Sequence, residues 1–455
     1  MYGNIKKIYF IGIGGIGMSG IAEVLINMGY EVSGSDLKKS KLIERLEKLG
    51  ADIYIGHSGK NISESDVVVY SSAIKEDNPE IISANAANIP LIPRAEMLAE
   101  LMRLKLGIAV VGSHGKTTTT SMIASVLSYG GLDPTIVVGG KVKSLDSNAH
   151  LGTGKFMVVE ADESDGSFEK LSPVITVLTN IDEEHLDHYK SMEALEDAFF
   201  KFLYKVPFYG LAVLCTDCPR TKTLAKKFNK KLITYGLNES ADLRAEKIEV
   251  SGFKTTFDVY FKNYPLGTIE LNTPGKHNAQ NALASIAVGM ELGLSFEKIK
   301  EGLNEFKGIE RRLQVKSEKN GILIIDDYGH HPKEIETTLE SIKLGFSKYP
   351  ILIFQPHRYS RTDLLYKEFV DVLKKIENLY VLDIYPAGEK PIKDISSKNL
   401  VEDIKKAGNK KATYINNPDD LIKELENTLV KGDIVLTTGA GNVWEYGEKL
   451  GNELK

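Results

Sequence analysis

Short runs of β-branched and aliphatic residues alternate with longer amphipathic stretches along the whole chain. The first of these runs are Lys7-Ile11, Glu31-Gly34 and Val67-Tyr70. Such alternation is typical of α/β proteins with parallel sheets, because a helix usually connects two parallel strands. The segment 242–270 differs, since its apolar and polar residues alternate with period two, and this pattern predicts an antiparallel insert.

The chain has 455 residues, which is too long for one hydrophobic core. Pro90 and Pro93 interrupt the pattern, and the predicted helix Arg94-Arg103 leads out of the first block. A new buried strand then opens a second block, and the third block begins near Leu313. The pattern therefore predicts three domains, at residues 1–105, 106–312 and 313–455.

A glycine loop follows the first strand of the second block. The strand is Gly107-Val111, and the apolar helix Met122-Leu127 comes after the loop. In a P-loop the backbone amides face phosphates, a lysine reaches the β- and γ-phosphates, and the next hydroxyl binds Mg²⁺. The residues that would bind ATP in this way are Gly112, Ser113, His114, Gly115, Lys116, Thr117 and Thr118.

The usual P-loop template has a glycine where this chain has Val110, so the loop is a shortened variant. The alternative is a glycine turn that precedes a helix and carries Lys-Thr by chance. The strand and the helix on either side of the loop favour the P-loop interpretation, because the motif requires both.

Two further strands of this block end in acidic clusters. Lys155-Glu160 leads into the sequence Ala-Asp-Glu-Ser-Asp, and Val174-Leu178 leads into a loop that contains His185. Ligands of parallel sheets bind beyond the carboxyl ends of the strands, so Glu160 and His185 are expected beside the P-loop. A carboxylate and an imidazole can hold a metal that bridges phosphate oxygens. The alternative interpretation is a solvated acidic loop.

The first block contains G-x-G-x-x-G at Gly12, Gly14 and Gly17, between a strand and the predicted helix Met18-Met28. Asp36 ends the next strand about 20 residues later, as in the dinucleotide fingerprint. Taken alone, this pattern indicates NAD. The underlying physics is a diphosphate on a helix N-terminus, however, so a UDP-sugar would fit equally well.

The third block has four strands that end in polar residues. They are Ile322-Ile325, Ile351-Phe354, Leu379-Asp383 and Ile434-Leu436. His357, Arg358 and Arg361 follow the second of them. The guanidinium fork pairs bidentately with a carboxylate, so these arginines suit a carboxylate substrate. A surface ion pair is the alternative for any one of these residues.

These motifs resemble those of the Mur ligases, the amide-bond ligases of peptidoglycan assembly, over essentially the whole chain. The glycine-rich loops of the first two blocks carry the resemblance together with four further segments. These segments are Ser71-Ser72-Ala73-Ile74, Glu160-Ala161-Asp162-Glu163-Ser164-Asp165, Asp327-Tyr328-Gly329-His330-His331-Pro332 and Pro356-His357-Arg358-Tyr359-Ser360-Arg361-Thr362. The last two segments are most similar to the alanine-adding branch of the family.

The resemblance implies an ATP-dependent enzyme that joins L-alanine to UDP-N-acetylmuramate through an acyl phosphate. It implies a Rossmann-like UDP-sugar domain, a central P-loop ATPase domain and a Rossmann-like C-terminal domain. It also implies two Mg²⁺ ions held by Thr117, Glu160 and His185, with Lys116 and Arg312 as further catalytic residues.

The remaining site residues follow from the same resemblance. Asn281, Arg312 and Asp327 would contact ATP, and Tyr328 would join His357, Arg358 and Arg361 in binding the amino acid. The expected UDP-sugar residues are Gly12, Gly14, Gly15, Gly17, Met18, Ser19, Asp36, Ser71 and Ser72. Many family members carry a carbamylated lysine about 15 residues after the metal-binding histidine, but Phe200 occupies that position here, beside Lys201.

Two other functions fit parts of the sequence. An NAD-dependent oxidoreductase explains the first glycine loop but leaves the P-loop without a role. A P-loop switch protein leaves the first loop and the His-Arg strand end unexplained. The net charge of −5 gives no indication of a nucleic-acid groove. No apolar run is long enough to cross a membrane. Cys215 and Cys218 are only two of the four ligands that a structural zinc site needs. We therefore expect a cytoplasmic protein with two free thiols.

Overall fold

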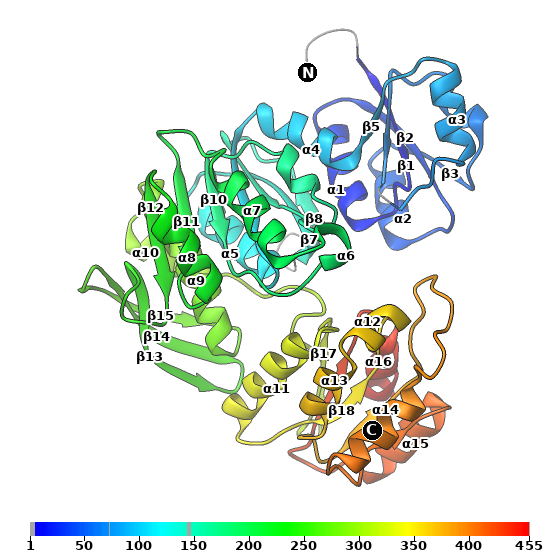
Figure 1. The fold of residues 1–455 in the computed structure, drawn as a ribbon, viewed down its shortest axis with the longest axis vertical. Helices are drawn as coiled ribbons and strands as arrows, with labels where there is room; N and C mark the ends of the chain where they lie inside the picture. Colours follow the sequence, from blue (N-terminus) through cyan, green and yellow to red (C-terminus); the bar gives the residue numbers. More distant parts are fainter. Residues whose placement is uncertain (1–4, 72, 143–146, 455) are drawn as a thin grey trace. The chain divides into compact units, whose positions relative to one another are not determined.

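The computed structural model describes residues 5–71, 73–142 and 147–454. Its three sheets lie one after another along the chain (Figure 1), which confirms the predicted α/β class with an N-terminal, a central and a C-terminal sheet. The chain divides into two compact units. The first unit is Met1–Lys247, Phe257–Glu270 and Ala279–Lys307, and the second is Ile248–Thr256, Leu271–Asn278 and Gly308–Lys455.

The N-terminal sheet is parallel throughout, with strand order β3-β2-β1-β4-β5. Its strands are β1 (Lys7–Ile11), β2 (Glu31–Asp36), β3 (Asp52–Ile55), β4 (Val67–Tyr70) and β5 (Leu91–Pro93). Its helices are α1 (Ile16–Asn27), α2 (Lys41–Lys48), η1 (Gly59–Ile62), α3 (Pro79–Ala86) and α4 (Arg94–Arg103). The chain crosses from one side of β1 to the other, so the loop after β1 lies at the topological switch point.

The central sheet has the order β15-β14-β13-β12-β11-β10-β6-β9-β7-β8. Its strands are β6 (Leu106–Val111), β7 (Thr135–Val142), β8 (Ser147–His150), β9 (Phe156–Glu160), β10 (Ile175–Leu178), β11 (Leu211–Cys215), β12 (Leu232–Gly236), β13 (Leu243–Ser251), β14 (Lys254–Phe261) and β15 (Tyr264–Leu271). Its helices are α5 (Lys116–Tyr129), η2 (Ser167–Lys170), α6 (Leu186–Tyr189), α7 (Met192–Leu203), α8 (Pro219–Lys227), α9 (Lys276–Glu291) and α10 (Phe296–Asn304).

Strand β6 pairs in parallel with β10 on one side and with β9 on the other. The loops after β6, β9 and β10 therefore emerge side by side at one edge of the sheet. Strands β13, β14 and β15 are neighbours joined by two-residue turns, which is how antiparallel strands connect, so the predicted insert at 242–270 is present. Cys215 and Cys218 are both free thiols, as predicted.

The C-terminal sheet has the order β16-β17-β21-β18-β19-β20 and is parallel except for the pair β16-β17. Its strands are β16 (Gln314–Lys319), β17 (Ile322–Asp327), β18 (Ile351–Phe354), β19 (Leu379–Val381), β20 (Thr413–Tyr414) and β21 (Ile434–Thr438). Its helices are α11 (Pro332–Phe346), α12 (Tyr359–Leu364), α13 (Tyr366–Leu373), α14 (Ser397–Lys406), α15 (Pro418–Thr428) and α16 (Val443–Glu453).

Both faces of the C-terminal sheet are buried. Leu323 and Ile325 of β17 belong to one apolar cluster, while Ile322 and Ile324 belong to a second. This arrangement explains why the strand is apolar at successive positions rather than at alternate ones.

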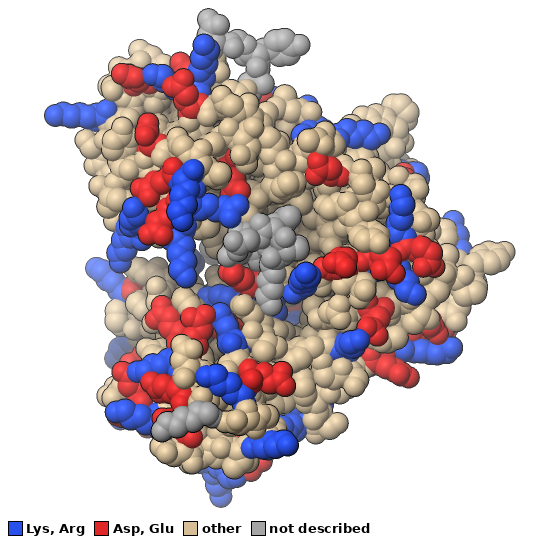
Figure 2. Space-filling view, turned by 180° about the vertical axis from the view of Figure 1, so that it is seen from behind, with Lys and Arg blue, Asp and Glu red and all other residues tan. Residues whose placement is uncertain are grey.

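Lysine, arginine, aspartate and glutamate side chains are interspersed on the face shown in Figure 2, without a large area of one sign. Within the described residues, no helix is long and apolar enough to cross a membrane.

Candidate active site

The glycine loop between β6 and α5 has the conformation that a phosphate loop requires. Gly112 and Gly115 have φ values of 128° and 79°, in the left-handed region where L side chains are strained. A Cβ atom at Gly112 would lie 2.3 Å from Thr179 Oγ1. The loop amide of Ser113 donates to the Asn180 carbonyl at 3.1 Å, so the segment after β10 supports the loop.

His114 is held by the segment after β10. Its backbone N–H donates to Asn180 Oδ1 at 2.8 Å, and its carbonyl accepts from Thr179 Oγ1 at 2.7 Å and from Asn180 Nδ2 at 3.0 Å. Its imidazole Nε2 lies 3.4 Å from Asp182 Oδ2. The loop therefore holds a fixed shape before any ligand binds.

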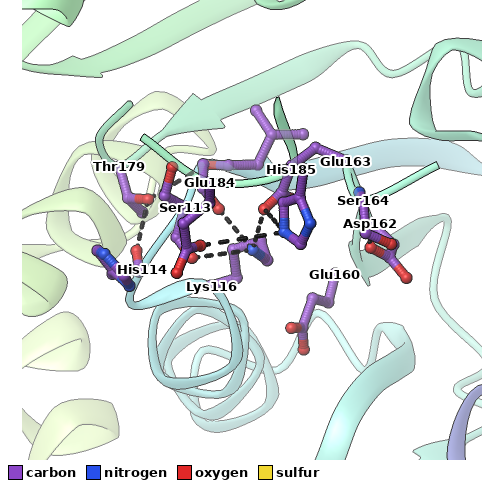
Figure 3. A network of polar contacts seen from close by, with 12 residues as sticks. Ser113, His114, Lys116, Glu160, Asp162, Glu163, Ser164, Thr179, Glu184 and His185 are labelled. Atoms are coloured by element: carbon purple, nitrogen blue, oxygen red, sulfur yellow. Dashed lines mark hydrogen bonds and ion pairs between the residues drawn. The ribbon is translucent and has the colours of Figure 1, made fainter. Parts of the chain in front are cut away.

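Lys116 begins helix α5, and its ammonium points back into the loop (Figure 3). The Nζ atom donates to the Gly112 carbonyl at 2.6 Å, to the Ser113 carbonyl at 3.1 Å and to Glu163 Oε1 at 2.6 Å. Burial alone would lower the pKa of Lys116, but the negative charges of Glu163 and Glu160 outweigh burial and raise it. The lysine is therefore a firmly charged cation in the centre of the loop.

The next side chain in α5 contacts the acid at the end of β9. Thr117 Oγ1 donates to Glu160 Oε1 at 2.9 Å, and Gly139 N donates to Glu160 Oε2 at 2.7 Å. Thr117 and Glu160 were both predicted as metal ligands, and they lie together beside the loop. Thr118, predicted to bind ATP, occupies the following position of α5.

His185 lies beside Glu163 and Glu184 and not beside Glu160. Its Nε2 is 3.7 Å from Glu163 Oε1 and 4.0 Å from Glu184 Oε2. One ligand atom from each of these three residues lies within 4.8 Å of the others, and Glu160 is outside this group. Figure 3 shows Glu160 apart from the residues around His185. The three predicted metal ligands are therefore split between two adjacent groups.

Glu163 was not predicted as a site residue. Its side chain is 1% exposed, and among the described residues its Oε2 atom has no hydrogen-bond partner. Burial raises the pKa of Glu163 to about 7, although Lys116 acts in the opposite direction. The sequence did indicate that an acid of the segment Glu160-Asp165 lies at the site, because this segment ends a strand. Four of its six residues are acidic, however, and their spacing does not show which of them faces the lysine.

The glycine loop of the N-terminal domain is supported mainly by backbone contacts. The amides of Gly12 and Ile13 donate to the Ser35 carbonyl at 2.8 and 3.0 Å, and Gly12 has a φ of 82°. The amide of Gly14 donates to Asp36 Oδ2 at 2.9 Å. Asp36, predicted to bind the UDP-sugar, therefore also fixes the loop.

The other predicted UDP-sugar residues differ in their position and burial around this loop. Gly15 precedes helix α1 as its N-cap, so the amides of the first helical turn face the end of β1. Met18 and Ser19 are 1% and 2% exposed, so their side chains are buried in the structure. Ser71 follows β4, with its Cβ 3.5 Å from where a Cβ of Gly12 would lie, whereas Ser72 lies outside the described residues.

Arg94, also absent from the predicted site, lies beside this loop. A Cβ atom at Gly17 would be 2.9 Å from Arg94 Nη1, so the third glycine of the motif makes room for the guanidinium. Arg94 Nη2 donates to Asp162 Oδ2 at 3.3 Å. The segment Glu160-Asp165 therefore contacts residues near both glycine loops.

Asn281, on α9, lies at the other side of the P-loop. Its Oδ1 accepts from Thr119 Oγ1 at 3.1 Å and would be 2.8 Å from a Cβ atom at Gly115. Phe200, in the position of the family's carbamylated lysine, packs in α7 against Tyr204, with ring centroids 4.9 Å apart. Lys201 is exposed on the same helix.

The second unit brings the remaining predicted residues to the ends of its strands. Asp327 accepts from the amides of Leu313 at 2.9 Å and Gly329 at 2.8 Å. Burial raises the pKa of Asp327, and Arg312 acts against this effect. The Arg312 guanidinium lies 5.5 Å from the centroid of the Tyr328 ring. Arg312, Asp327 and Tyr328 therefore form one neighbourhood.

His357 and Arg361 lie together after β18. Arg361 Nη1 is 3.2 Å from His357 Nδ1, and the His357 ring stacks on Tyr385 with centroids 5.5 Å apart. Burial, with the nearby Arg361 and Arg358 charges, lowers the pKa of His357 to about 4. The His357 imidazole is consequently neutral near pH 7. Arg358 has a φ of 70° and immediately precedes helix α12.

Three family models match successive parts of the chain. They are described as the Mur ligase family catalytic domain at residues 7–106, the Mur ligase middle domain at 110–289, and the Mur ligase glutamate ligase domain at 311–441.

Curated relatives match over the full length. A UDP-N-acetylmuramate--L-alanine ligase of Geotalea daltonii is 53% identical over 455 residues, which is 100% of this chain and 99% of the relative. A protein of the same name from Geotalea uraniireducens is 54% identical over 455 residues, with the same coverage.

Solved structures share the fold. The crystal structure of a UDP-N-acetylmuramate-alanine ligase from Thermotoga maritima is 30% identical, with a TM-score of 0.84 and 98% of both chains covered. A murein peptide ligase from Psychrobacter arcticus is 25% identical, with a TM-score of 0.72, and the match covers 99% of this chain and 98% of that one.

Proposed function

The chain belongs to the Mur ligase family, and from this premise we propose that it joins L-alanine to UDP-N-acetylmuramate with cleavage of ATP to ADP and phosphate. The product is an amide, and the reaction belongs to peptidoglycan synthesis. The full-length relatives with more than half of their residues identical carry the name of this activity. The single structural observation that carries the proposal is the charged Lys116 in a preformed glycine loop, with Glu160 and Glu163 from the end of β9 beside it.

The reaction proceeds in two steps. The muramoyl carboxylate attacks the γ-phosphorus of ATP, and the bond to the β,γ-bridging oxygen breaks, which gives an acyl phosphate and ADP. The amine of L-alanine then attacks the acyl carbon, loses a proton and displaces inorganic phosphate. The first step brings a carboxylate towards a triphosphate, so neutralising negative charge is the main task of the site.

The chain offers cations for this task. We assign Lys116 to the β- and γ-phosphates, and we assign the amides of Gly112, Ser113, His114 and Gly115 to the phosphate oxygens. Thr117, Thr118, Asn281, Arg312 and Asp327 complete the proposed ATP site. An NAD-dependent oxidoreductase would have no use for Lys116 or for the acids around it.

The side chains near the loop suit Mg²⁺. Hydroxyl and carboxylate oxygens are ligands that this ion accepts. The buried Oε2 of Glu163 is an oxygen of this kind, and it has no hydrogen-bond partner among the described residues. Thr117 and Glu160 would hold one ion, and His185 would hold a second. When bound, the ions would supply positive charge to the transferring phosphoryl group.

The two other substrates are assigned to the outer domains. The proposed UDP-sugar residues are Gly12, Gly14, Gly15, Gly17, Met18, Ser19, Asp36, Ser71 and Ser72. Tyr328, His357, Arg358 and Arg361 are proposed to bind L-alanine, because its carboxylate is the one strongly charged group that an arginine fork can recognise. We also propose that the UDP-sugar domain ends at residue 105 and that the central ATP-binding domain ends at residue 312.

The direct test is phosphate release measured with each substrate omitted in turn. We expect release only when ATP, UDP-N-acetylmuramate, L-alanine and Mg²⁺ are all present, and an amide product by mass spectrometry. Release without the UDP-sugar would indicate a P-loop NTPase of another kind. In the same assay, Arg358→Ala and Arg361→Ala should raise the KM for L-alanine, and a defect confined to ATP would contradict their assignment.

A further inference from the structure

All three protons of the Lys116 ammonium are already used inside the chain. They are donated to the carbonyls of Gly112 and Ser113 and to Glu163 Oε1. A lysine ammonium has three donors and no acceptor. Lys116 therefore cannot reach a phosphate without releasing at least one of these partners, and Glu163 is the only charged group among the three.

Glu163 is poorly suited to lose its cation. Its side chain is 1% exposed, and the 2.6 Å contact with Lys116 has the length of a charge-assisted hydrogen bond. A buried carboxylate without a counter-charge is strongly unfavourable. If Lys116 turns towards a phosphate, Glu163 needs another positive charge nearby.

The groups around Glu163 offer a place for that charge. Its Oε2 is buried without a hydrogen-bond partner among the described residues, and one ligand atom each from Glu163, Glu184 and His185 lie within 4.8 Å of one another. A divalent cation can neutralise both Glu163 and the phosphates, whereas a nucleotide that arrives alone places more negative charge beside a buried anion.

We propose that Glu163 is a positioning residue that holds Lys116 in the empty loop and makes nucleotide binding depend on a divalent cation. The inference rests on the proposed function, since it requires that the loop bind ATP and ADP. Without the cation, Glu163 and the phosphates compete for Lys116. With the cation, Glu163 releases the lysine without becoming an unpaired charge.

The carboxylate can be removed without removing the supports of its loop. The Glu163 backbone carbonyl accepts from the Tyr189 hydroxyl at 2.6 Å and from the Gly166 amide at 3.1 Å. Glu163→Gln keeps the shape of the side chain and these backbone contacts, and it loses only the charge. Asp165→Asn is the matched control, because Asp165 is an exposed acid of the same segment and its Oδ1 accepts the Ser167 amide.

The test is calorimetric titration of the full chain with ADP, with and without Mg²⁺, at a pH of about 8 so that carboxylates are ionised. In Glu163→Gln, ADP without Mg²⁺ should bind more tightly, by roughly 10- to 150-fold, the range of a charge-assisted bond. Binding with Mg²⁺ should change less, so the ratio of the two dissociation constants falls at least tenfold. Asp165→Asn should keep the wild-type ratio.

An unchanged ratio in Glu163→Gln, or weaker binding of metal-free ADP, would overturn the inference. If Glu163→Gln does not fold, Glu163→Met places a side chain of similar volume without polar atoms in the buried position, and it should show the same fall in the ratio. Wild-type protein that binds ADP with the predicted metal dependence supports the proposed function by itself. Protein that binds no ADP under either condition would refute both proposals.

Discussion

The two glycine loops of the first unit have the same local design and different chemistry. Each follows a buried parallel strand and begins a helix of at least 12 residues, α1 or α5. In the loop at Gly12 the contacts are mostly backbone to backbone, and Asp36 accepts a loop amide. In the loop at Gly112 a buried lysine fills the centre and two buried or half-buried acids surround it.

The difference shows that a loop conformation specifies an anion site but not the anion. Backbone amides at a helix N-terminus bind any phosphate. The two sites differ in the charged side chains around the loop. These are Lys116 with Glu163 in one loop, and Arg94 beside Gly17 in the other. The site with the fixed cation and the acids suits phosphoryl transfer, and the other suits binding without chemistry.

The strongest test of this contrast is Lys116→Ala. The variant removes the only cation inside the central loop that the structure describes, so we expect ATP turnover to fall by about 10²- to 10³-fold, as for loss of a transition-state donor. The affinity for UDP-N-acetylmuramate should stay within about twofold. Turnover by phosphate release, sugar binding by calorimetry and folding by circular dichroism check the three parts. A folded variant with near-normal turnover would refute the contrast.

Arg94→Ala tests the other loop. Because the guanidinium lies against Gly17, its loss should raise the KM for the UDP-sugar by roughly 10- to 150-fold and leave the KM for ATP nearly unchanged. Arg103→Ala is the control, since Arg103 is on the same helix and its Nη1 pairs with Glu100 at the surface. A defect in ATP instead would indicate that Arg94 acts through its contact with Asp162.

Most of the fold could be predicted from the sequence, because the apolar runs are long and periodic. β1 and β4 match the predicted ranges, and helix α1 begins at Ile16 instead of Met18. The site residues that were missed depend on contacts between distant segments. Glu163 faces a lysine 47 residues away and Arg94 faces an aspartate 68 residues away. No local spacing encodes such pairs.

The split of His185 from Glu160 could not be predicted for a related reason. Glu160 ends β9 and His185 follows β10, and these two strands end at the same edge of the sheet, which placed both residues near the loop. Which carboxylate faces the imidazole depends on the turn after β9 and on the left-handed conformation of His185, with a φ of 58°. Sequence patterns give the edge of the sheet, and side-chain packing decides the pairing.

The pH dependence of stability should also report on the buried acid of the central loop. The pKa of Glu163 is raised from 4.5 to about 7 in the folded chain. Protonated Glu163 therefore favours folding below about pH 4.5, and this contribution is lost as the pH rises through about 7. The loss is on the order of 3 kcal/mol.

Denaturant unfolding of metal-free protein between about pH 4.5 and 8 measures this difference. Glu163→Gln should flatten the part of the profile that belongs to the central loop. Equal slopes in wild type and Glu163→Gln would contradict the assigned burial of the carboxylate.

The smallest expected difference concerns the glycines themselves. Gly112→Ala places a Cβ atom 2.3 Å from Thr179 Oγ1 at a φ of 128°, so both strain and overlap destabilise the loop. Gly12→Ala has a φ of 82°, and its nearest neighbour, Ser71 Cβ, lies at 3.5 Å, so only backbone strain of about 1 kcal/mol is expected. Gly112→Ala should therefore lower the free energy of unfolding by about 1–2 kcal/mol more than Gly12→Ala.

Gly15→Ala is the control, because no left-handed φ is required there and the nearest atom, the Gly12 carbonyl oxygen, is 3.4 Å away. Thermal unfolding of the three variants ranks them, and an equal loss at Gly12 and Gly112 would show that the two loops are strained alike and differ only in their charged side chains.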